Sequence, residues 1–411
     1  MSTFTPVAAV PFRETTLPSE LLPVSLKLKP RRLESIDVLR GLLMIVMALD
    51  HTRHFFSKAN VDPTDPLQSW PALFFTRWIT HLCAPGFVAL AGTSVYLQRQ
   101  RGISASSMAT KLAARGIWLI FIEVAVVSFG IFFTYQVHLL QVIYAIGGSM
   151  IVLALLQFLP TLYVAAYGFL IVCLHNLLDK VQPHHAVGLW KFFVMPGPFL
   201  NHGRVWIMDT YPILPWSGIM ALGYAFGAIV TLPGAKRRMR AIQFGLTALA
   251  LFVTLRLSNG YGDPLLFTHL ATTRQTVMSF FQVTKYPPSL HYVCGTFGFL
   301  LLLFALFDYA LERRWIPRVL GVFTIYGRVP FFYYIPHFYI LHVLAVIVLM
   351  STLHTTHIMI QSTFGSARPG TGFSLPVVYA IWASVVTILY LPCRWFAGVK
   401  ARRRDWWLSY L

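Results

Sequence analysis

Residues 31–56 read RRLESIDVLRGLLMIVMALDHTRHFF, in which a long apolar centre separates two charged ends. A helix needs about twenty mainly apolar residues to cross the hydrocarbon core of a bilayer. The run at 36–56 meets that requirement, and its charged side chains lie near the ends, where they can reach headgroups or water. This stretch therefore predicts the first of a series of transmembrane helices.

Nine more apolar runs of similar length follow along the chain. They lie near 72–97, 113–134, 138–159, 161–178, 212–232, 241–257, 291–311, 329–350 and 375–397, and 318–328 predicts a short extra helix. Hydrophobic residues make up 56% of the 411 positions and charged residues only 11%, too few to cover the surface of a protein in water. The predicted fold is all-α, a polytopic membrane bundle of about ten to eleven transmembrane helices in contact with lipid.

Basic residues fall in alternate connections between these predicted helices. The clusters lie before the first helix and after the second, sixth, eighth and tenth: Lys27, Lys29, Arg31 and Arg32; Arg99, Arg101, Lys111 and Arg115; Lys236, Arg237, Arg238 and Arg240; Arg313, Arg314 and Arg318; Lys400, Arg402, Arg403 and Arg404. Cytoplasmic loops carry the excess of Lys and Arg, so the N- and C-termini are both expected in the cytoplasm. We expect an integral protein of the bacterial inner membrane.

The remaining organisation follows from this orientation. Residues 1–30 are proline-rich without a continuous apolar run, which predicts a flexible cytoplasmic tail before a membrane domain at 31–411. The loops at 57–71, 179–211 and 258–290 are expected to face the periplasm or a lumen. The two longer loops are long enough to form lids or re-entrant segments over a cavity.

Several classes of protein are excluded by the same sequence. The net charge of +19 does not predict nucleic-acid binding, because the Lys and Arg residues are confined to short connections between apolar runs. The four cysteines lie in apolar runs without a CxxC pair, and no HExxH motif occurs, so neither a disulfide nor a metal site is predicted. The sequence also lacks Walker A, GxGxxG and GxSxG motifs, which argues against nucleotide hydrolysis and serine-hydrolase chemistry.

Charged residues inside the first predicted helix are the strongest sign of function. Asp37 and Arg40 are three residues apart and can pair at one end, and Asp50 and His54 are four apart and can pair at the other. A carboxylate that bonds one imidazole nitrogen raises the basicity of the other, as a general base or nucleophile requires. Asp50, His51 and His54 are therefore catalytic candidates with Arg53 beside them; the alternative is that they are ordinary interfacial residues.

The second predicted helix adds Arg77 and His81 on one face. His81 lies too deep to reach the headgroups and is a candidate to meet His51 across the first two helices. The alternative is a core histidine bonded to a carbonyl.

Later helices contribute further polar residues that could line the same cavity. Glu123 lies inside the third predicted helix, and His138 and Gln141 open the fourth at i and i+3 spacing. A polar strip in and before the ninth helix contains Tyr326, Arg328, Tyr333, Tyr334, His337 and His342. For its tyrosines, packing or a position in the interfacial belt is the alternative interpretation.

Six stretches of this sequence carry a family resemblance. They are RLESIDVLRG followed by DH in the first helix, HLCAPGFVALAGTS in the second, QVIYAIGGSM at 141–150, YPILPWSGIMALGY at 211–224, KYPPSL at 285–290 and YGRVPFFYY at 326–334. In these stretches the chain resembles the heparan-alpha-glucosaminide N-acetyltransferase catalytic-domain-like family of transmembrane acyltransferases, especially its bacterial branch. The resemblance spans nearly all of the helical region.

The resemblance implies an activity and a donor. Acetyl-CoA from the cytosol would supply an acyl group to an amine or hydroxyl of a sugar on the far side of the membrane. A histidine near the outer end of the first helix is the expected active-site group, and His51 and His54 lie there. His81 stands where the animal enzymes have an acidic residue, so the motif alone does not assign the role to one histidine.

Acyl transfer from acetyl-CoA requires a base or nucleophile, donors to the oxyanion and cations for the CoA phosphates, and the candidate residues can be matched to these roles. His51 or His54 with Asp50 would supply the base or nucleophile, and Arg53, Tyr334 or His81 the donors to the oxyanion. The cations available for CoA phosphates at the inner face are Arg40, Arg99, Arg115 and Arg328, and Tyr334 is also assigned to the cofactor site. The substrate-binding candidates are Asp37, Arg53, Arg77, His138, Gln141 and His337.

Two functions from different classes account for these residues. The first is a membrane acyltransferase acting on an envelope glycan. The second is a proton-coupled transporter or flippase of a small polar or lipid-linked substrate, because buried Asp and His residues also carry protons in such proteins. A structural role would leave the intramembrane charges without a purpose. The sequence leaves the acceptor, the acyl chain and the oligomeric state open, a homodimer included.

Overall fold

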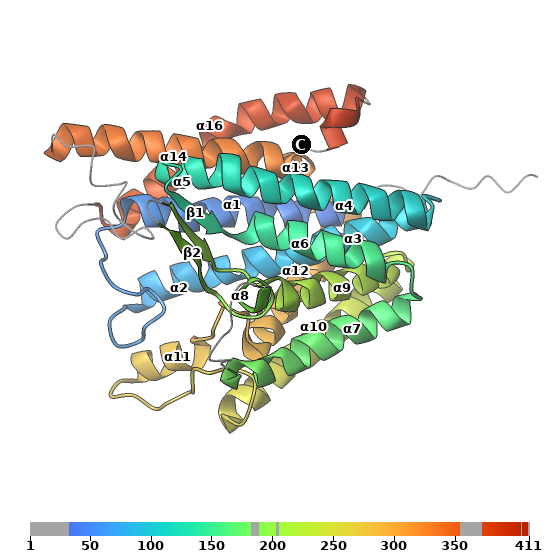
Figure 1. Cartoon of the computed structure of the whole chain (residues 1–411), viewed down its shortest axis with the longest axis horizontal. Coiled ribbons are helices and arrows are strands. Elements are labelled where there is room, and N and C mark those ends of the chain that lie inside the picture. The colour runs from blue at the N-terminus through green and yellow to red at the C-terminus, as the bar shows by residue number, and fades with distance from the viewer. Residues whose placement is uncertain (1–32, 182–188, 203–204, 354–371, 404, 410–411) are drawn as a thin grey trace, which may run out of the picture. The chain divides into compact units, whose positions relative to one another are not determined.

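The computed structural model describes residues 33–181, 189–202, 205–353, 372–403 and 405–409, and the predicted N-terminal tail lies outside them. Long helices lying side by side make up most of the described chain (Figure 1). The α-helices are α1 (Glu34–Phe56), α2 (Pro71–Ile79), α3 (Cys83–Gln100), α4 (Ala105–Ile122), α5 (Ser128–Phe132), α6 (Val142–Leu156), α7 (Thr161–Leu174), α8 (Leu189–Phe193), α9 (Ile213–Val230), α10 (Gly234–Ser258), α11 (Thr273–Phe281), α12 (Leu290–Glu312), α13 (Pro317–Arg328), α14 (Pro330–Leu353) and α16 (Leu375–Arg402). The predicted helical bundle is confirmed in outline, and α13 is the predicted short extra helix.

Eight helical segments of the described chain are long and apolar enough to cross a membrane. They are 71–100, 105–132, 161–179, 213–230, 234–258, 290–312, 330–348 and 375–402. Two more helices lie where the sequence predicts spans but differ from these eight: α6 is 15 residues long, and α1 carries charges at both ends. The predicted number of spans and the side on which the termini lie remain predictions.

Helix α1 tolerates its charges because it lies among other helices. It packs against α3, α12, α13, α14 and α16, and both Asp37 and Asp50 are buried there. By contrast, only 17% of the apolar window of α16 is buried within the protein, so most of that helix is left to face lipid. The arrangement puts the charges of α1 next to other protein groups that can pair with them.

Glycines allow some of these helices to touch through their backbones. A Cβ atom on Gly41 of α1 would lie 1.7 Å from the carbonyl oxygen of Phe323 in α13, and one on Gly327 would lie 1.8 Å from that of Asp37. The GxxxG pair Gly223 and Gly227 likewise lies against α3. Such close approach is typical of small residues at membrane helix interfaces.

The main error in the predicted elements concerns the start of the fourth helix. Residues Val137–Leu140 form strand β1 rather than helix, and α6 begins at Val142. With β2 (Gly197–His202) and β3 (Val205–Asp209), β1 builds a three-stranded sheet in the order β1-β3-β2; β1 pairs with β3 in parallel and β2 with β3 antiparallel (Figure 1). The prediction of a helical His138 is therefore wrong, because a distant segment pairs with its backbone.

Two local irregularities interrupt the second and third predicted spans. A 3₁₀ turn at Thr80–Leu82 separates α2 from α3, and a π-helical turn at Glu123–Val127 separates α4 from α5. π turns inside α-helices are rare and are frequently found at functional sites. His81 and Glu123, two residues singled out by the sequence, lie in these irregular turns.

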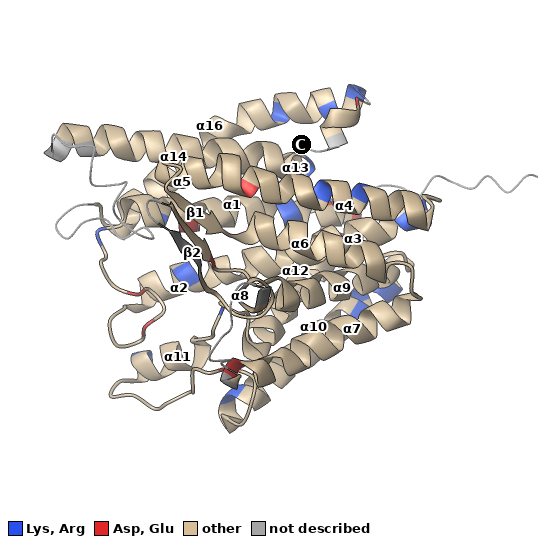
Figure 2. Ribbon diagram, in the orientation of Figure 1, with Lys and Arg blue, Asp and Glu red and all other residues tan. Residues whose placement is uncertain are grey.

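Lys and Arg residues are concentrated at one end of the bundle (Figure 2). Figure 2 shows long uncharged stretches of helix, with more Lys and Arg ribbon at the right-hand helix ends, near α3, α4 and α9, than at the left-hand ends. At the basic end, Arg237 and Arg238 of α10 form ion pairs with Asp308 of α12, at 2.7 and 3.2 Å. These pairs join two neighbouring helices there.

Candidate active site

A buried carboxylate joins α1 to α2. One oxygen of Asp50 accepts from Nη2 of Arg53 at 3.1 Å, and the other accepts from Nη1 of Arg77 at 3.2 Å. Arg77 also donates to Oγ1 of Thr80 at 2.8 Å. Pairing of this kind is what allows charges to remain inside a membrane protein. The three charged residues therefore form a fixed electrostatic centre at this end of α1.

The predicted Asp50–His54 pair is replaced by this arrangement. Both carboxylate oxygens of Asp50 are engaged by arginines, and His54 accepts through Nε2 from Arg53 at 3.2 Å. The Arg53 side chain thus lies between the two residues that helical spacing alone would join. His54 is left in contact with a cation instead of a carboxylate.

His51 pairs with a histidine from α14. Its Nδ1 lies 2.6 Å from Nε2 of His337, and Nδ1 of His337 lies within hydrogen-bond distance of the carbonyl oxygen of Tyr334. A carbonyl only accepts, so Nδ1 of neutral His337 carries the proton and its Nε2 accepts from His51. The bonding pattern therefore leaves Nε2 of His51 with a free lone pair.

Aromatic neighbours hold this pair of rings in place. The His51 ring stacks on Phe338 with centroids 4.3 Å apart, and it meets the edge of Tyr334 at 6.5 Å. His337 is fully buried, whereas His51 is partly exposed. The partly exposed His51 ring is the more accessible of the two, and the buried His337 ring is placed to orient it.

Tyr334, whose ring meets His51 edge-on, also carries a hydroxyl group. It is 3% exposed, and its hydroxyl has no hydrogen-bond partner among the residues that the structure describes. Glu123, at the start of the π turn, lies within electrostatic reach of Tyr334, and its Oε2 accepts from the backbone N–H of Tyr144 at 3.0 Å. A buried hydroxyl with unmet bonding capacity, on a ring that lies edge-on to His51, is a candidate donor to a reacting oxygen.

His81 lies in a different contact from the one predicted. Its ring meets Tyr292 of α12 edge to face at 5.3 Å, and the Tyr292 hydroxyl donates to the His81 carbonyl at 2.8 Å. The ring that contacts His51 comes from α14 and not from His81. Nδ1 of His81 is buried and lacks a hydrogen-bond partner within the described ranges.

Lys285 is a site residue that the sequence interpretation missed. Its Nζ lies over the rings of Tyr211 and Tyr286, 5.6 and 5.1 Å from their centroids. Its charge also acts on Asp50 and His81. The KYPPSL stretch at 285–290 already stood out for its family resemblance, and a lone Lys in a predicted outer loop with few cations was the available signal.

The sequence analysis did not select Asp209 either, although it bonds Tyr211, whose ring lies under Lys285. It ends β3, and its Oδ1 accepts from the backbone N–H of Tyr211 at 2.7 Å. Burial raises the pKa of Asp209 to about 8, against the effect of that hydrogen bond. Its carboxyl group is therefore largely protonated at neutral pH, and the protonated form can donate as well as accept.

The remaining predicted residues lie on several elements. The predicted Asp37–Arg40 ion pair is confirmed at 3.3 Å, and Arg40 also donates to the Gly327 carbonyl at 3.1 Å. Arg328 is the next residue along α13, so two predicted donor-binding cations have adjacent backbones. Arg40 and His51 are eleven positions apart, about 16 Å along α1.

Arg115, His138 and Gln141 lie on other elements again. Arg115 is on α4, His138 is in β1 and Gln141 is the last residue before α6. Gln141 also takes part in the turn that brings the start of α6 to Glu123. The substrate and cofactor roles of these three residues stay predictions.

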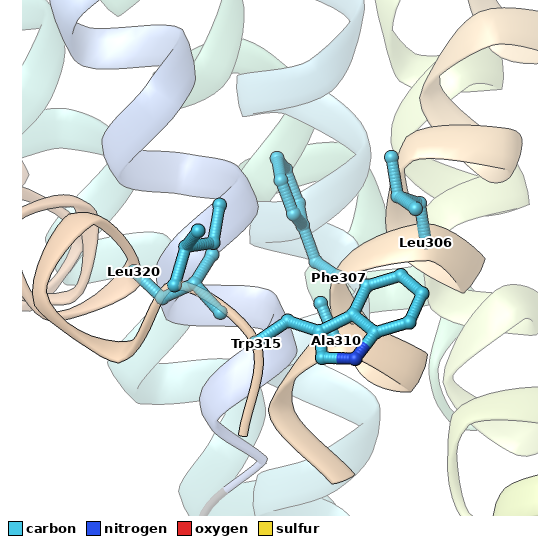
Figure 3. Close-up of a pocket in the computed structure, with 6 residues that line it drawn as sticks. Leu306, Phe307, Ala310, Trp315 and Leu320 are labelled. Carbon is cyan, nitrogen blue, oxygen red and sulfur yellow. The ribbon is translucent and has the colours of Figure 1, made fainter. Parts of the chain in front are cut away.

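A pocket of about 410 Å³ lies elsewhere, between the end of α12 and the start of α13. Figure 3 shows Phe307, Trp315 and Leu320 around it, and the complete lining is Leu306, Phe307, Ala310, Trp315, Ile316 and Leu320. This lining contains no titratable side chain, although catalysis of acyl transfer requires one. The His51 site therefore remains the candidate for this chemistry, and the pocket does not.

Comparison with known proteins gives one result that bears on these residues. A family model described as heparan-alpha-glucosaminide N-acetyltransferase, catalytic, matches residues 32–257, which is more than half of the chain. The match contains Asp50, His51 and Arg77, whereas Lys285 and His337 lie beyond it. No curated protein matches the chain. The chain belongs to the heparan-alpha-glucosaminide N-acetyltransferase family of membrane acetyltransferases, as its sequence motifs predict.

Proposed function

We propose that this protein moves an acetyl group from acetyl-CoA, at the basic end of the bundle, to an amine or hydroxyl of an envelope glycan at the opposite end. The observation that carries the proposal is the His51–His337 hydrogen bond, which leaves Nε2 of His51 as a free base in a partly exposed ring. Family membership supplies the reaction class, and the site supplies the reacting atom.

Nε2 of His51 can act either as a general base or as a nucleophile. As a general base it takes the proton of the acceptor while the acceptor nitrogen or oxygen attacks the thioester carbonyl and CoA thiolate leaves. As a nucleophile it attacks that carbonyl itself and displaces CoA thiolate, and the acetyl group then passes from His51 to the acceptor, whose proton goes to the thiolate or to water. In both cases His51 becomes positively charged, and its Nδ1–H bond to His337 stabilises that charge.

The developing oxyanion requires a hydrogen-bond donor near His51. Tyr334 is a candidate for this role because its ring lies edge-on to His51 and its buried hydroxyl has no partner in the described part of the chain. The donor thioester would then lie between Tyr334 and the exposed edge of His51.

The donor phosphates are assigned to Arg40, Arg328 and Arg115, which lie toward the basic end. The distance of about 16 Å along α1 between Arg40 and His51 requires an extended donor, which CoA is. Asp37 fixes Arg40 through their ion pair. In this proposal the acceptor approaches from the side of Arg77, His81 and Lys285.

A proton-coupled transporter or flippase is the second candidate. The observation in its favour is the buried network of Asp50, Arg53 and Arg77 next to stacked histidines, since such networks also conduct protons. A transporter would move a substrate without consuming acetyl-CoA, so the two candidates differ in a measurable product.

The two candidates are separated in proteoliposomes that hold an amino sugar inside and receive radiolabelled acetyl-CoA outside. The acyltransferase produces labelled N-acetyl sugar in the lumen, and His51→Ala abolishes it while His269→Ala, a histidine in an exposed loop, does not. Sugar efflux without acetylation, independent of acetyl-CoA, would reject the acyltransferase in favour of the transporter.

A further inference from the structure

The apolar pocket of about 410 Å³ lies beside the last turns of α12, at the end of a helix long enough to span a membrane. Phe307, Ala310 and Leu320 line it and are less than one-tenth exposed, whereas Leu306 is 50% exposed and Trp315 52%. Figure 3 shows side chains of α12, of the following turn and of α13 around the same space. The pocket therefore has a buried apolar floor and an apolar rim that is open to its surroundings.

The turn at 313–316, between α12 and α13, fixes the rim of this pocket. The backbone N–H of Trp315 donates to the carbonyl oxygen of Ala310 at 2.9 Å, and the Trp315 ring meets Tyr309 edge-on with centroids 5.2 Å apart. Arg314 and Ile316, on either side of Trp315, have φ angles of 55° and 39°, which are uncommon for residues with a side chain and rare for a β-branched one. Strain of this kind persists only where the surrounding structure enforces it, and ligand sites are among those places. The rim is thus built into the turn.

Positive charge is in excess next to this apolar rim. Arg314 directly precedes Trp315 and Arg318 follows Ile316 by two positions, and both arginines are exposed. The two carboxylates in the last turns of α12 are already paired with arginines of α10. Neither Arg314 nor Arg318 belongs to an ion pair within the described ranges. Two cations are therefore available for an anion at the open side of the pocket.

We infer that this pocket binds one acyl chain of an anionic phospholipid, whose headgroup phosphate lies against Arg314 and Arg318. The end of a spanning helix lies where the hydrocarbon of the bilayer meets the headgroups, and Trp315 is of the residue type that favours this level. Basic pockets beside transmembrane helices bind anionic headgroups. A neutral lipid would leave the cations without a partner, and a free anion would leave the pocket unfilled. Charge and shape together therefore select a charged lipid.

The test measures lipid binding to the purified full-length protein after it has been delipidated in detergent. Phosphatidylglycerol and phosphatidylcholine with identical acyl chains are titrated in turn, and native mass spectrometry gives the affinity for the first bound lipid. Phosphatidylglycerol should bind at least about tenfold more tightly, as expected for two cations beside one phosphate that lacks a compensating choline. Equal affinities for the two lipids would overturn the inference.

The double variant Arg314→Gln/Arg318→Gln tests the headgroup contact. It should remove most of the preference for phosphatidylglycerol and leave the weak binding of phosphatidylcholine unchanged. Arg101→Gln/Lys111→Gln is the matched control, because it removes two exposed cations from another basic connection. An equal loss of preference in the two double variants would reduce the effect to general surface charge and reject the site.

Ala310→Phe tests the acyl-chain contact, because its side chain would occupy the floor of the pocket. This variant should bind both lipids at least about tenfold more weakly than wild type. Leu306→Trp places the same obstruction at the half-exposed rim and keeps the test open if Ala310→Phe does not fold. Wild-type affinity for phosphatidylglycerol in a folded form of either variant would show that the chain binds elsewhere.

Two further results distinguish other occupants of the same site. Glycerol 3-phosphate carries the phosphate without acyl chains and should not displace bound phosphatidylglycerol; displacement would assign the cations to a free anion and reject the lipid. The same mass spectra report the oligomeric state. A dimer that carries no lipid and dissociates on Leu306→Trp would assign the pocket to a second copy of the chain. Acetyl transfer does not enter these measurements, so the inference and the proposed function can fail separately.

Discussion

At the scale of single residues, the hydrogen bond between His51 and His337 determines which nitrogen can react. His337 donates to the Tyr334 carbonyl and can therefore only accept from His51 while both rings are neutral. His337 accepts the His51 proton and orients the ring, as a carboxylate does in many histidine-based sites, but it adds no charge inside the membrane. Helical spacing suggested Asp50 for this role, but both of its carboxylate oxygens accept hydrogen bonds from Arg53 and Arg77.

His337→Phe tests this positioning role. The phenyl ring can keep the stacking on His51 but cannot accept its proton, so the correct tautomer and the stabilised charge are lost. We expect kcat for acetyl transfer to fall about 100-fold, with little change in KM for acetyl-CoA. His269→Phe is the control. A His337→Phe protein with kcat within about twofold of wild type would contradict the proposed hydrogen-bond chain.

Asp209 makes a prediction about pH. Its pKa is raised from 3.8 to about 8 in the folded protein, so the folded state favours the protonated carboxyl. This contribution to stability is complete below about pH 4 and is lost as pH rises through about 8, at a slope of at most about 1.4 kcal/mol per pH unit. Asp209→Asn removes the titrating group and therefore this slope.

The measurement is the midpoint of thermal unfolding for wild type and Asp209→Asn between pH 5 and 9. The variant should gain stability relative to wild type as pH rises across that range. Parallel profiles for the two proteins would show that burial does not shift this carboxyl.

At the scale of elements, the contact between α1 and α13 positions the basic end of the site, at Asp37 and Arg40. Gly327→Ala would put a methyl group 1.8 Å from the Asp37 carbonyl oxygen, and the two backbones would have to separate. We expect a clear fall in the unfolding midpoint, together with loss of activity because Arg40 bonds the Gly327 carbonyl.

Gly321→Ala is the matched control for that substitution. It lies in the same helix, and a Cβ there would meet nothing within 4 Å. Because Ala is the better helix former, this variant should be as stable as wild type or slightly more stable. Equal destabilisation by the two substitutions would mean that the close approach of α1 and α13 is not what Gly327 provides.

The elements that the sequence predicted are those encoded by local pattern. Long apolar runs gave the helices, and the stretch 318–328 gave α13. Strand β1 was missed because its partner, β3, lies nearly seventy positions away, as the pairing of Leu140 with Asp209 shows. The π turn at Glu123 was missed because hydrophobic periodicity does not distinguish it from an ordinary helical turn.

At the scale of the whole molecule, the candidate site is assembled from segments far apart in the chain. His51 and His337 are 286 positions apart, and Lys285 comes from a third region. Sequence motifs therefore identified His51, His54 and His81 as candidates without showing which ring each would meet. Charge pairing was predictable only within one helix, as for Asp37 and Arg40.

The orientation of the chain can be measured directly. Lys58→Cys lies in the loop predicted to be outside, and Arg101→Cys in the loop predicted to be cytoplasmic. Both would be labelled with a membrane-impermeant maleimide in a background where native Cys173, which is partly exposed, is replaced by Ser. Lys58→Cys should react in spheroplasts and Arg101→Cys only in inverted vesicles. The opposite labelling would reverse the orientation and with it the sides assigned to donor and acceptor.

If acetyl-CoA reacts at Nε2 of His51, free CoA thiol is released, and this release can be measured with purified protein in nanodiscs. We predict that wild type and His269→Ala release thiol from acetyl-CoA when an amino sugar is present, and that His51→Ala slows this release at least about 100-fold while acetyl-CoA still binds. Thiol release by His51→Ala at the wild-type rate would show that Nε2 of His51 is not the reacting atom.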